Sequence, residues 1–483
     1  MYSLSPCGVF QAFRSRSWPE RSAAISRLLL CLFFFDCAWA GGGHYFPNAP
    51  IQPRLLLGAL ILLTALPVLG RCLAKEHRMV VLSLGCFLAW MAVCALRGLR
   101  AGNSREVLLG DVRGFLWFFL LPVCAALLRT REQLRRVESC VLAGAFVQAL
   151  LSLGCNYYCA IHPDAVEQAG AAVYGMFLGN VSGVSDSIVR IFFFSSPYLI
   201  AACAIALFRQ VHTPRFRLSY TVLTAFYFTA LLLTFTRSLY GATGIAAVLA
   251  VLLALIGNRK RLRRVCSHIL VTAVLTLCLI LSQEVLLQGS YLNFGLSRTL
   301  GTEVTVSKAY KARAVLASRY GITFDFLGGT SRSEDQLADE EDQQSDYLDV
   351  TEASDALRKE TVRQLRQLIA KNPIFGNGLG ASTEVRDNGF DEMFYLDVLC
   401  RMGIVGLLLY LAPLAWILLR FLRLEPGSRA SCAEVLLPAY CGLAAFLFAS
   451  AYNPWLNAVL GISWYALSAA LPNLTHQSPE INL

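Results

Sequence analysis

The sequence predicts an all-α, polytopic integral membrane protein with about twelve transmembrane helices and one large exported loop between spans 9 and 10. Three observations support this fold class. Only 15% of the 483 residues are charged, too few to cover the surface of a soluble protein. The apolar residues form runs of about 20 residues, the length of a membrane-spanning helix. These runs do not alternate in polarity as barrel strands do, which favours helices.

The apolar runs divide the chain into candidate spans joined mostly by short loops. The spans cover residues 25–40, 54–70, 79–96, 114–128, 137–160, 188–208, 218–235, 239–257, 265–287, 395–419, 433–450 and 454–471. Basic residues gather in alternate loops, among them Asn258–Arg264 and Arg420–Arg429. The positive-inside rule places these loops and both termini in the cytoplasm. The net charge of +10 therefore reads as a topology signal, and no nucleic-acid partner is expected.

Two N-terminal segments allow a second interpretation. Arg97–Arg113 lies outside in this topology yet carries four arginines. Either the span count is wrong there, or those arginines meet an anionic substrate, which we favour because the later loops fit the rule. Ala38-Trp39-Ala40 resembles a signal-peptide cleavage site. We expect an uncleaved first span, and both interpretations leave the later topology unchanged.

Topology divides the chain into three parts: residues 1–287 with about nine spans, an exported loop at 288–390, and residues 391–483 with about three spans. Inside the loop, Glu334–Asp355 holds ten acidic residues and no basic one, which is typical of a solvated, mobile segment. Ser354–Lys371 follows as an amphipathic helix with one apolar face. That face rests either on the membrane surface or on the bundle of spans.

Two arginines are candidates for a functional site. Arg237 lies in Thr234–Gly241, a hairpin between two spans that is too tight to lift the side chain clear of the membrane interface. An ionisable residue at this depth usually faces a cavity or a partner, and an arginine that snorkels to the interface is the alternative. Arg190 stands at the exported start of a span, where it is either an interface anchor or a second cation of the same site.

The segment Lys371–Leu411 is the third candidate. Pro373 ends the preceding helix, and the glycines at alternate positions of 376–380 allow a tight turn. Asp391 and Glu392 lie just before the next span. The segment is either a simple re-entry loop with acids at the interface or part of a site.

In their order along the chain these pieces resemble the O-antigen ligase and polymerase superfamily of bacterial envelope glycan enzymes, over residues 185–471. In that family an arginine-bearing helix leads into a glycine turn, a His-Asn-x-Tyr-Leu stretch and a Gly-Ile-x-Gly that opens a span. The corresponding residues here are Arg358, Pro373–Gly380, Tyr395-Leu396 and Gly403–Gly406. Thr236–Gly241 looks like the family's Ser-Arg hairpin, and Arg190 falls where the family has an arginine before its middle span.

The chain departs from the family pattern at the family's histidine. Counting back from Gly403, Glu392 holds the histidine position and Met393 the asparagine position. Ligases usually keep this histidine, so the departure favours the polymerase branch, with a ligase that transfers glycan to lipid A core as the alternative. A transporter or flippase is the alternative of another class. Transporters commonly carry broken helices near the midplane in both halves, whereas the unusual residues here concentrate on the exported side of the second half.

The resemblance implies an inverting glycosyltransferase on the exported face of the bacterial inner membrane, acting on a glycan linked to undecaprenyl diphosphate. Arg190, Arg237 and Arg358 would clamp the diphosphate, because a guanidinium pairs bidentately with phosphate and stays charged. Tyr395 and Asp391 are assigned to substrate binding together with Arg190.

Glu392 is the candidate general base for the acceptor hydroxyl, with Asp391 and Asp397 as substitutes. Desolvation beside a membrane raises the pKa of a carboxyl towards the working pH, and inverting glycosyl chemistry uses such a base on the opposite face of the sugar. No ligand cluster indicates a metal, and no cofactor is expected. The expected partners are the lipid-linked glycan, the lipid bilayer and other proteins of envelope polysaccharide assembly.

Overall fold

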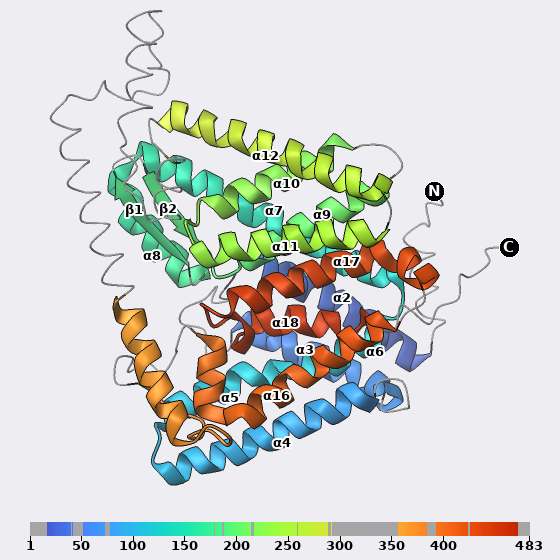
Figure 1. The fold of residues 1–483 in the computed structure, drawn as a ribbon, viewed down its shortest axis with the longest axis vertical. Helices are drawn as coiled ribbons and strands as arrows, with labels where there is room; N and C mark the ends of the chain where they lie inside the picture. Colours follow the sequence, from blue (N-terminus) through green and yellow to red (C-terminus); the bar gives the residue numbers. More distant parts are fainter. Residues whose placement is uncertain are drawn as a thin grey trace, which may run out of the picture. The chain divides into compact units, whose positions relative to one another are not determined.

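A computed structural model gives the fold (Figure 1). It describes residues 17–39, 41, 52–72, 78–177, 179–185, 188–213, 217–257, 259–287, 291, 356–383, 393–423 and 426–471. These residues are mostly helical, as the sequence predicts. They belong to two compact units, and the first joins both ends of the sequence. It comprises Met1–Cys37, Ala49–Val141 and Thr361–Leu483, and the second comprises Ala38–Asn48 and Leu142–Glu360.

The first unit is a bundle of helices. Its elements are α2 (Trp18–Trp39, up to Cys37), α3 (Pro53–Cys72), α4 (Arg78–Ala101), α5 (Arg105–Leu116), the 3₁₀ turn η1 (Trp117–Phe119), α6 (Leu120–Leu127), α16 (Phe394–Leu422), α17 (Pro426–Ala449), η4 (Trp455–Asn457) and α18 (Val459–Ser468). A helix at 356–371 enters this unit at residue 361. α18 is short, and its residues from Leu460 onwards are buried.

Aromatic side chains fill the centre of the first unit. Phe118 contacts Tyr410 and Tyr465 edge to face, with ring centroids 5.1 and 5.6 Å apart. The hydroxyl of Tyr410 donates to the carbonyl of Leu456 at 2.8 Å, and the hydroxyl of Tyr465 donates to the carbonyl of Tyr410 at 2.7 Å. Each buried hydroxyl therefore has an acceptor, so burial leaves no unpaired donor there.

The second unit combines helices with a small sheet. Its elements are α7 (Arg131–Ile161, from Leu142), η2 (Pro163–Ala165), α8 (Val166–Phe177), β1 (Asn180–Ser185), β2 (Ile188–Phe192), α9 (Pro197–His212), α10 (Leu218–Leu232), α11 (Arg237–Gly257) and α12 (Arg259–Leu287). β1 and β2 pair antiparallel, with Ser182 opposite Arg190. Val181, Val189 and Ile191 of this hairpin are buried in one apolar cluster with Cys159 of α7.

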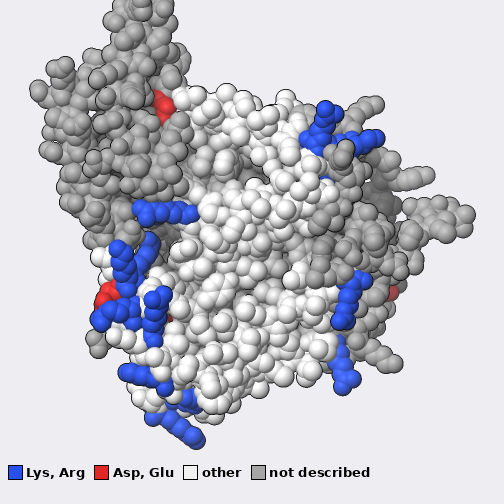
Figure 2. Space-filling model, in the orientation of Figure 1, with Lys and Arg blue, Asp and Glu red and all other residues white. Residues whose placement is uncertain are grey.

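By length and composition, the chain is a membrane protein. Among the described residues, seven helices are long and apolar enough to cross a bilayer, and five shorter apolar helices accompany them. Each of the predicted spans overlaps one of these helical segments, while the number of crossings stays a prediction. Figure 2 shows that most described residues on the visible face are uncharged, as expected of a lipid-facing surface.

Two expectations about span limits are wrong. The predicted span 188–208 begins with strand β2, and its helix starts only at Pro197. The β-branched residues of β2 favour extended backbone, and proline suits the first turn of a helix because it has no N–H to satisfy. Arg190 therefore lies on a strand rather than at the start of a span.

Arg97–Arg113 is also not a loop. Arg97 and Arg100 belong to the last turns of α4, Arg105 opens α5, and residues 102–104 alone connect the two helices. The Ser104 side chain caps α5 by accepting a hydrogen bond from the Val107 amide at 3.5 Å. The arginines thus sit on two helix ends, which gives them fixed positions.

The amphipathic helix is present at 356–371, close to its predicted limits. Leu365, Leu368 and Ile369 pack with Cys400 and Leu396 of α16, so its apolar face lies on the helix bundle. Leu357, predicted on the same face, is 45% exposed. The acidic segment Glu334–Asp355 lies outside the described residues, and the three predicted topological parts stay a prediction.

Candidate functional site

α16 is broken at Gly403. This residue has φ +69° and ψ −173°, so two helical pieces meet there at a kink. The break releases main-chain groups that a continuous helix would pair. The amide of Ile404 donates to the carbonyl of Pro373 at 2.9 Å, and the amide of Val405 donates to the carbonyl of Ile374 at 3.2 Å. Main chain from the preceding segment therefore replaces the missing helical bonds, as a helix broken inside a membrane requires.

The preceding segment is the glycine turn, residues 373–381. Gly376, Gly378 and Gly380 all have left-handed backbone, with φ +71°, +90° and +79°, which side chains of L-residues rarely tolerate. The turn also donates hydrogen bonds to α16. The amide of Asn377 donates to the carbonyl of Cys400 at 2.8 Å, and the amide of Gly378 donates to the carbonyl of Arg401 at 3.0 Å. The predicted tight turn is thus present and is joined to the kink.

The same turn is fastened to α4. The amide of Leu379 donates to the carbonyl of Cys94 at 3.0 Å, and the side-chain nitrogen of Asn103 donates to the carbonyl of Leu379 at 3.0 Å. A Cβ on Gly378 would overlap the backbone of Gly98. Close contact between two backbones explains why both positions are glycine.

A buried ion-pair network lies beneath the turn. Arg401, which is 3% exposed, pairs with Asp111 of α5 and, through Nε at 2.8 Å, with Asp397 one helical turn earlier. The other oxygen of Asp111 accepts the amide hydrogen of Gly380 at 2.9 Å. Two carboxylates share one guanidinium. Removal of Arg401 would leave both carboxylates buried without their cation.

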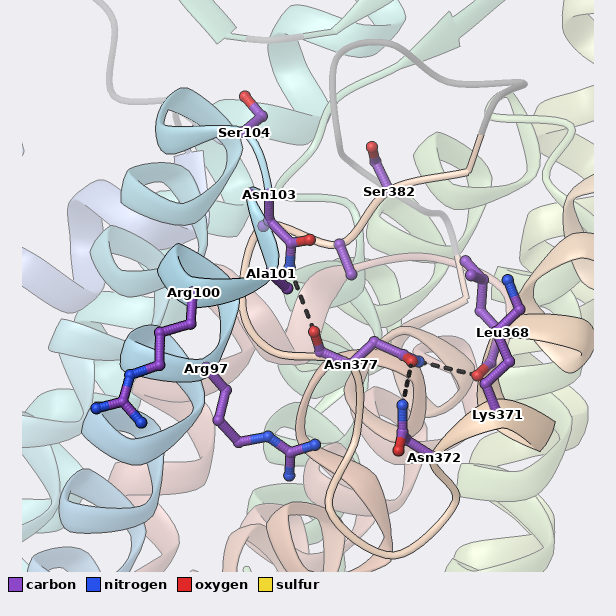
Figure 3. Close-up of a pocket in the computed structure, with 13 residues that line it drawn as sticks. Arg97, Arg100, Ala101, Asn103, Ser104, Leu368, Lys371, Asn372, Asn377 and Ser382 are labelled. Carbon is purple, nitrogen blue, oxygen red and sulfur yellow. Dashed lines mark hydrogen bonds between the residues drawn. The ribbon is translucent and has the colours of Figure 1, made fainter.

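A cavity of about 680 Å³ opens between the end of α4, the end of helix 356–371 and the glycine turn (Figure 3). Its lining residues are Arg97, Arg100, Ala101, Gly102, Asn103, Ser104, Leu368, Lys371, Asn372, Asn377, Gly380, Ala381 and Ser382. They include three cations and no carboxylate. Of the four arginines in Arg97–Arg113, Arg97 and Arg100 line this cavity, and their contact with an anionic substrate stays a prediction.

In the second unit, Arg190 reaches the turn that precedes α11. Its Nε donates to the carbonyl of Thr234 at 3.1 Å, and the amide of the next residue, Ile191, donates to the carbonyl of Leu233 at 3.1 Å. Phe235 in that turn has φ +45°, which is uncommon for a bulky residue. The strand β2 is therefore bonded to a strained turn that leads directly into Arg237.

Burial lowers the pKa of Arg190, and the positive charge of Arg358 lowers it further, while Tyr240 opposes both effects. A neighbouring like charge disfavours the protonated guanidinium, so Arg190 and Arg358 repel each other. Arg237 is exposed at the first position of α11, and Arg358 is exposed on helix 356–371. The structure thus brings Arg190 beside the turn of Arg237 and within electrostatic range of Arg358.

The remaining predicted site residues have different outcomes. Asp391 and Glu392 lie outside the described residues. Tyr395 is half-buried, and its hydroxyl donates to the carbonyl of Leu447 at 2.7 Å. Asp397 is buried and paired with Arg401, and its role as a substitute base stays a prediction.

Sequence reasoning missed Arg401 and Asp111. One signal was present, because Asp397 and Arg401 stand four residues apart on an apolar helix, the spacing of a helical ion pair. An ionisable residue inside a membrane span also usually pairs with another polar or charged group. No local pattern connects either residue to Asp111, which comes from a distant helix.

The described residues hold no cluster of three or more His, Cys, Asp or Glu side chains able to ligate a metal. Comparison of the chain with models of known protein families gives no match, and comparison with curated proteins gives none either. The residues of this chain and the resemblance of their pattern are therefore the basis for a functional proposal.

Proposed function

We propose that this chain is an inverting glycosyltransferase of a bacterial inner membrane. It would join oligosaccharide repeats carried on undecaprenyl diphosphate, at the exported face. The observation that carries the proposal is the position of Arg190, which is bonded to the turn before Arg237 and lies within electrostatic range of Arg358. The sequence resemblance supplies the reaction class.

A diphosphate suits this group of arginines. Arg190 is largely withdrawn from water, and among the described residues it contacts the Thr234 carbonyl and the Phe192 ring but no carboxylate. A multiply charged anion would relieve the repulsion between Arg190 and Arg358. Guanidinium groups also pair with phosphate oxygens through two parallel hydrogen bonds, which fixes the orientation of the donor.

The proposed reaction is a single displacement at the anomeric carbon of the donor sugar. The acceptor hydroxyl oxygen forms the new bond to that carbon while Glu392 takes the hydroxyl proton. The bond from the anomeric carbon to the diphosphate oxygen breaks, and its electron pair leaves with undecaprenyl diphosphate. The arginines stabilise the charge that develops on this leaving group.

Gel analysis of surface glycan from a deletion strain tests the proposal. Loss of long chains, with a single repeat retained, is the expected result. Loss of every repeat from lipid A core would instead indicate a ligase that uses the same donor. Unchanged glycan would contradict the transferase proposal.

Complementation of that strain assigns the effect to the clamp. Arg237→Lys keeps the positive charge but loses the bidentate fork, so we expect shorter glycan chains at a normal amount of membrane-inserted protein. Arg263→Lys is the matched control, because Arg263 is exposed on α12 of the same unit. Equal glycan profiles for the two variants would remove Arg237 from the clamp.

Thiol labelling tests the proposed orientation. Single cysteines at Ser331 and Arg261, in a background without native thiols, are probed in intact spheroplasts with an impermeant reagent. Labelling at 331 but not at 261 is expected for an exported loop and a cytoplasmic basic loop. The opposite pattern would invert the topology and place the site on the wrong face.

A further inference from the structure

Among the described residues, no acidic side chain pairs with the cations that line the cavity of the first unit. Arg97 bonds the Phe375 carbonyl at 3.2 Å and lies over the Phe375 ring. Lys371 and Arg100 are exposed and pair with no carboxylate among the described residues. The nearest carboxylates, Asp111 and Asp397, share Arg401, which offsets one of their two charges and leaves fewer negative charges than the three cations of the cavity. The cavity is therefore electropositive within the part of the chain that the structure describes.

The cavity also offers hydrogen-bond acceptors. The side-chain nitrogen of Asn103 donates to carbonyls of the glycine turn, which leaves its side-chain oxygen to accept a hydrogen bond from a ligand. Asn372 likewise donates through its nitrogen to Asn377 at 3.0 Å and keeps its oxygen. In Figure 3, Asn103 and Lys371 lie on opposite sides of Asn377, so acceptor and cation face a common space.

We propose that this cavity binds the acidic portion of an anionic oligosaccharide. Lys371 and Arg97 would hold a carboxylate or phosphate of the ligand, and the oxygens of Asn103 and Asn372 would accept from neighbouring sugar hydroxyls. A phosphate ion carries its charge and its P–OH on a single phosphorus, so it is too small to reach the cations and both asparagine oxygens at once. A phosphatidylglycerol headgroup offers hydroxyls beside its phosphate and is therefore the competing class of ligand. An acidic sugar satisfies the cations and the asparagine oxygens together.

The cavity is preorganised by contacts that do not involve a ligand. Asn377 is fixed on both sides, because its side-chain nitrogen donates to Leu368 at 2.9 Å and to Cys400 at 3.1 Å. The Gly380 amide is held by buried Asp111. Since Asn377 and Gly380 of the lining are already ordered, little conformational entropy is lost on binding. The proposal does not depend on the transfer reaction, because it concerns binding alone.

Binding to the purified full chain in nanodiscs of zwitterionic lipid is the test, measured by titration calorimetry. The probes are trigalacturonate and, as a neutral trisaccharide of the same length, maltotriose. We expect trigalacturonate to bind at least about tenfold more tightly than maltotriose, the effect of one charge-assisted hydrogen bond. Failure of trigalacturonate to bind, or equal affinity for both probes, would overturn the proposal.

Variants locate the binding in the cavity. Lys371→Gln should weaken trigalacturonate binding about tenfold, and Lys371→Arg should restore much of it. Arg366→Gln is the matched control, because Arg366 is exposed on the same helix but does not line the cavity. Thermal unfolding midpoints confirm that all variants fold. An equal loss for Lys371→Gln and Arg366→Gln would show general electrostatic attraction and refute the site.

Two further probes separate the sources of negative charge. Inorganic phosphate should compete only weakly, because it is too small to contact the cations and the asparagine oxygens together. Nanodiscs that contain phosphatidylglycerol should leave the Kd of trigalacturonate nearly unchanged. Strong competition by either one, removed by Lys371→Gln, would assign the cavity to a phosphate or a lipid headgroup and overturn the saccharide proposal.

Discussion

Arg401 in the first unit and Arg190 in the second are both arginines in surroundings that exclude much of the water, yet their neighbours differ. Arg401 is enclosed by the carboxylates of Asp111 and Asp397. Arg190 contacts a carbonyl and an aromatic ring, and its nearest charged influence is another arginine. Arg401 is thus paired with carboxylates, whereas Arg190 contacts no carboxylate in the part of the chain that the structure describes.

The comparison teaches that burial alone does not identify a functional arginine. A compensated cation such as Arg401 acts as a connector between helices, because its removal would strand two buried acids. An uncompensated cation such as Arg190 is destabilising in the unliganded protein and becomes favourable with an anion present. Stability and activity should therefore respond in opposite ways to changes at the two positions.

The largest effect is expected for Arg401→Met. Because Asp111 and Asp397 would remain buried without a partner, the free energy of unfolding should fall by about 3–5 kcal/mol. Denaturant titration in mixed micelles measures it, with Arg423→Met as the control, since Arg423 is exposed just after α16. A comparable decrease in the free energy of unfolding for Arg190→Met would show that the two arginines do not differ in their contribution to stability.

Glu392→Gln tests the contrast between two carboxylates, Glu392 as the proposed general base and Asp397 as the ion-pair partner of Arg401. Transfer should fall by about a hundredfold or more, the range of general-base loss, while donor binding changes little. Glu392→His, which restores the family's usual residue, should keep partial activity. A normal transfer rate in the Gln variant, at normal protein level, would pass the role to Asp391.

Gly378→Ala tests the rigidity of the turn above Arg401. The left-handed backbone of Gly378 and its contact with Gly98 should make alanine destabilising by about 1–3 kcal/mol. Gly85→Ala on α4 is the matched control, because a Cβ there meets open space and alanine favours helix. The thermal unfolding midpoint should fall for Gly378→Ala alone, and equal midpoints would mean that the turn yields without strain.

The smallest effect is expected for Arg190→Lys. Lysine keeps the charge but loses the Nε donor to Thr234 and the planar fork, so transfer should decrease about tenfold. The free energy of unfolding should change by less than about 0.5 kcal/mol, since no carboxylate is stranded. A loss of stability without a loss of transfer would make Arg190 a structural residue.

Local patterns in the sequence were enough to predict the helices, the amphipathic segment and the glycine turn. Hydrophobic runs mark a span wherever it packs, and Pro373 ends its helix by its own geometry. The hairpin of β1 and β2 was missed, because its apolar residues continue into α9 and look like one run. The partnership of Arg401 with Asp111 was missed because it joins distant helices, and no periodicity reports a pairing of that kind.

The break at Gly403 ties the synthesis of the chain to its assembly. A ribosome makes α4 first, then the glycine turn, and α16 last. The carbonyls of Cys400 and Arg401 find their donors in the turn, and that of Met402 finds its donor in Trp90 of α4 at 3.0 Å. In hydrocarbon, unpaired carbonyls are costly, so the carbonyls freed at the break are satisfied only when the turn and α4 are both in place. We therefore expect α16 to insert stably only after the earlier segment has folded.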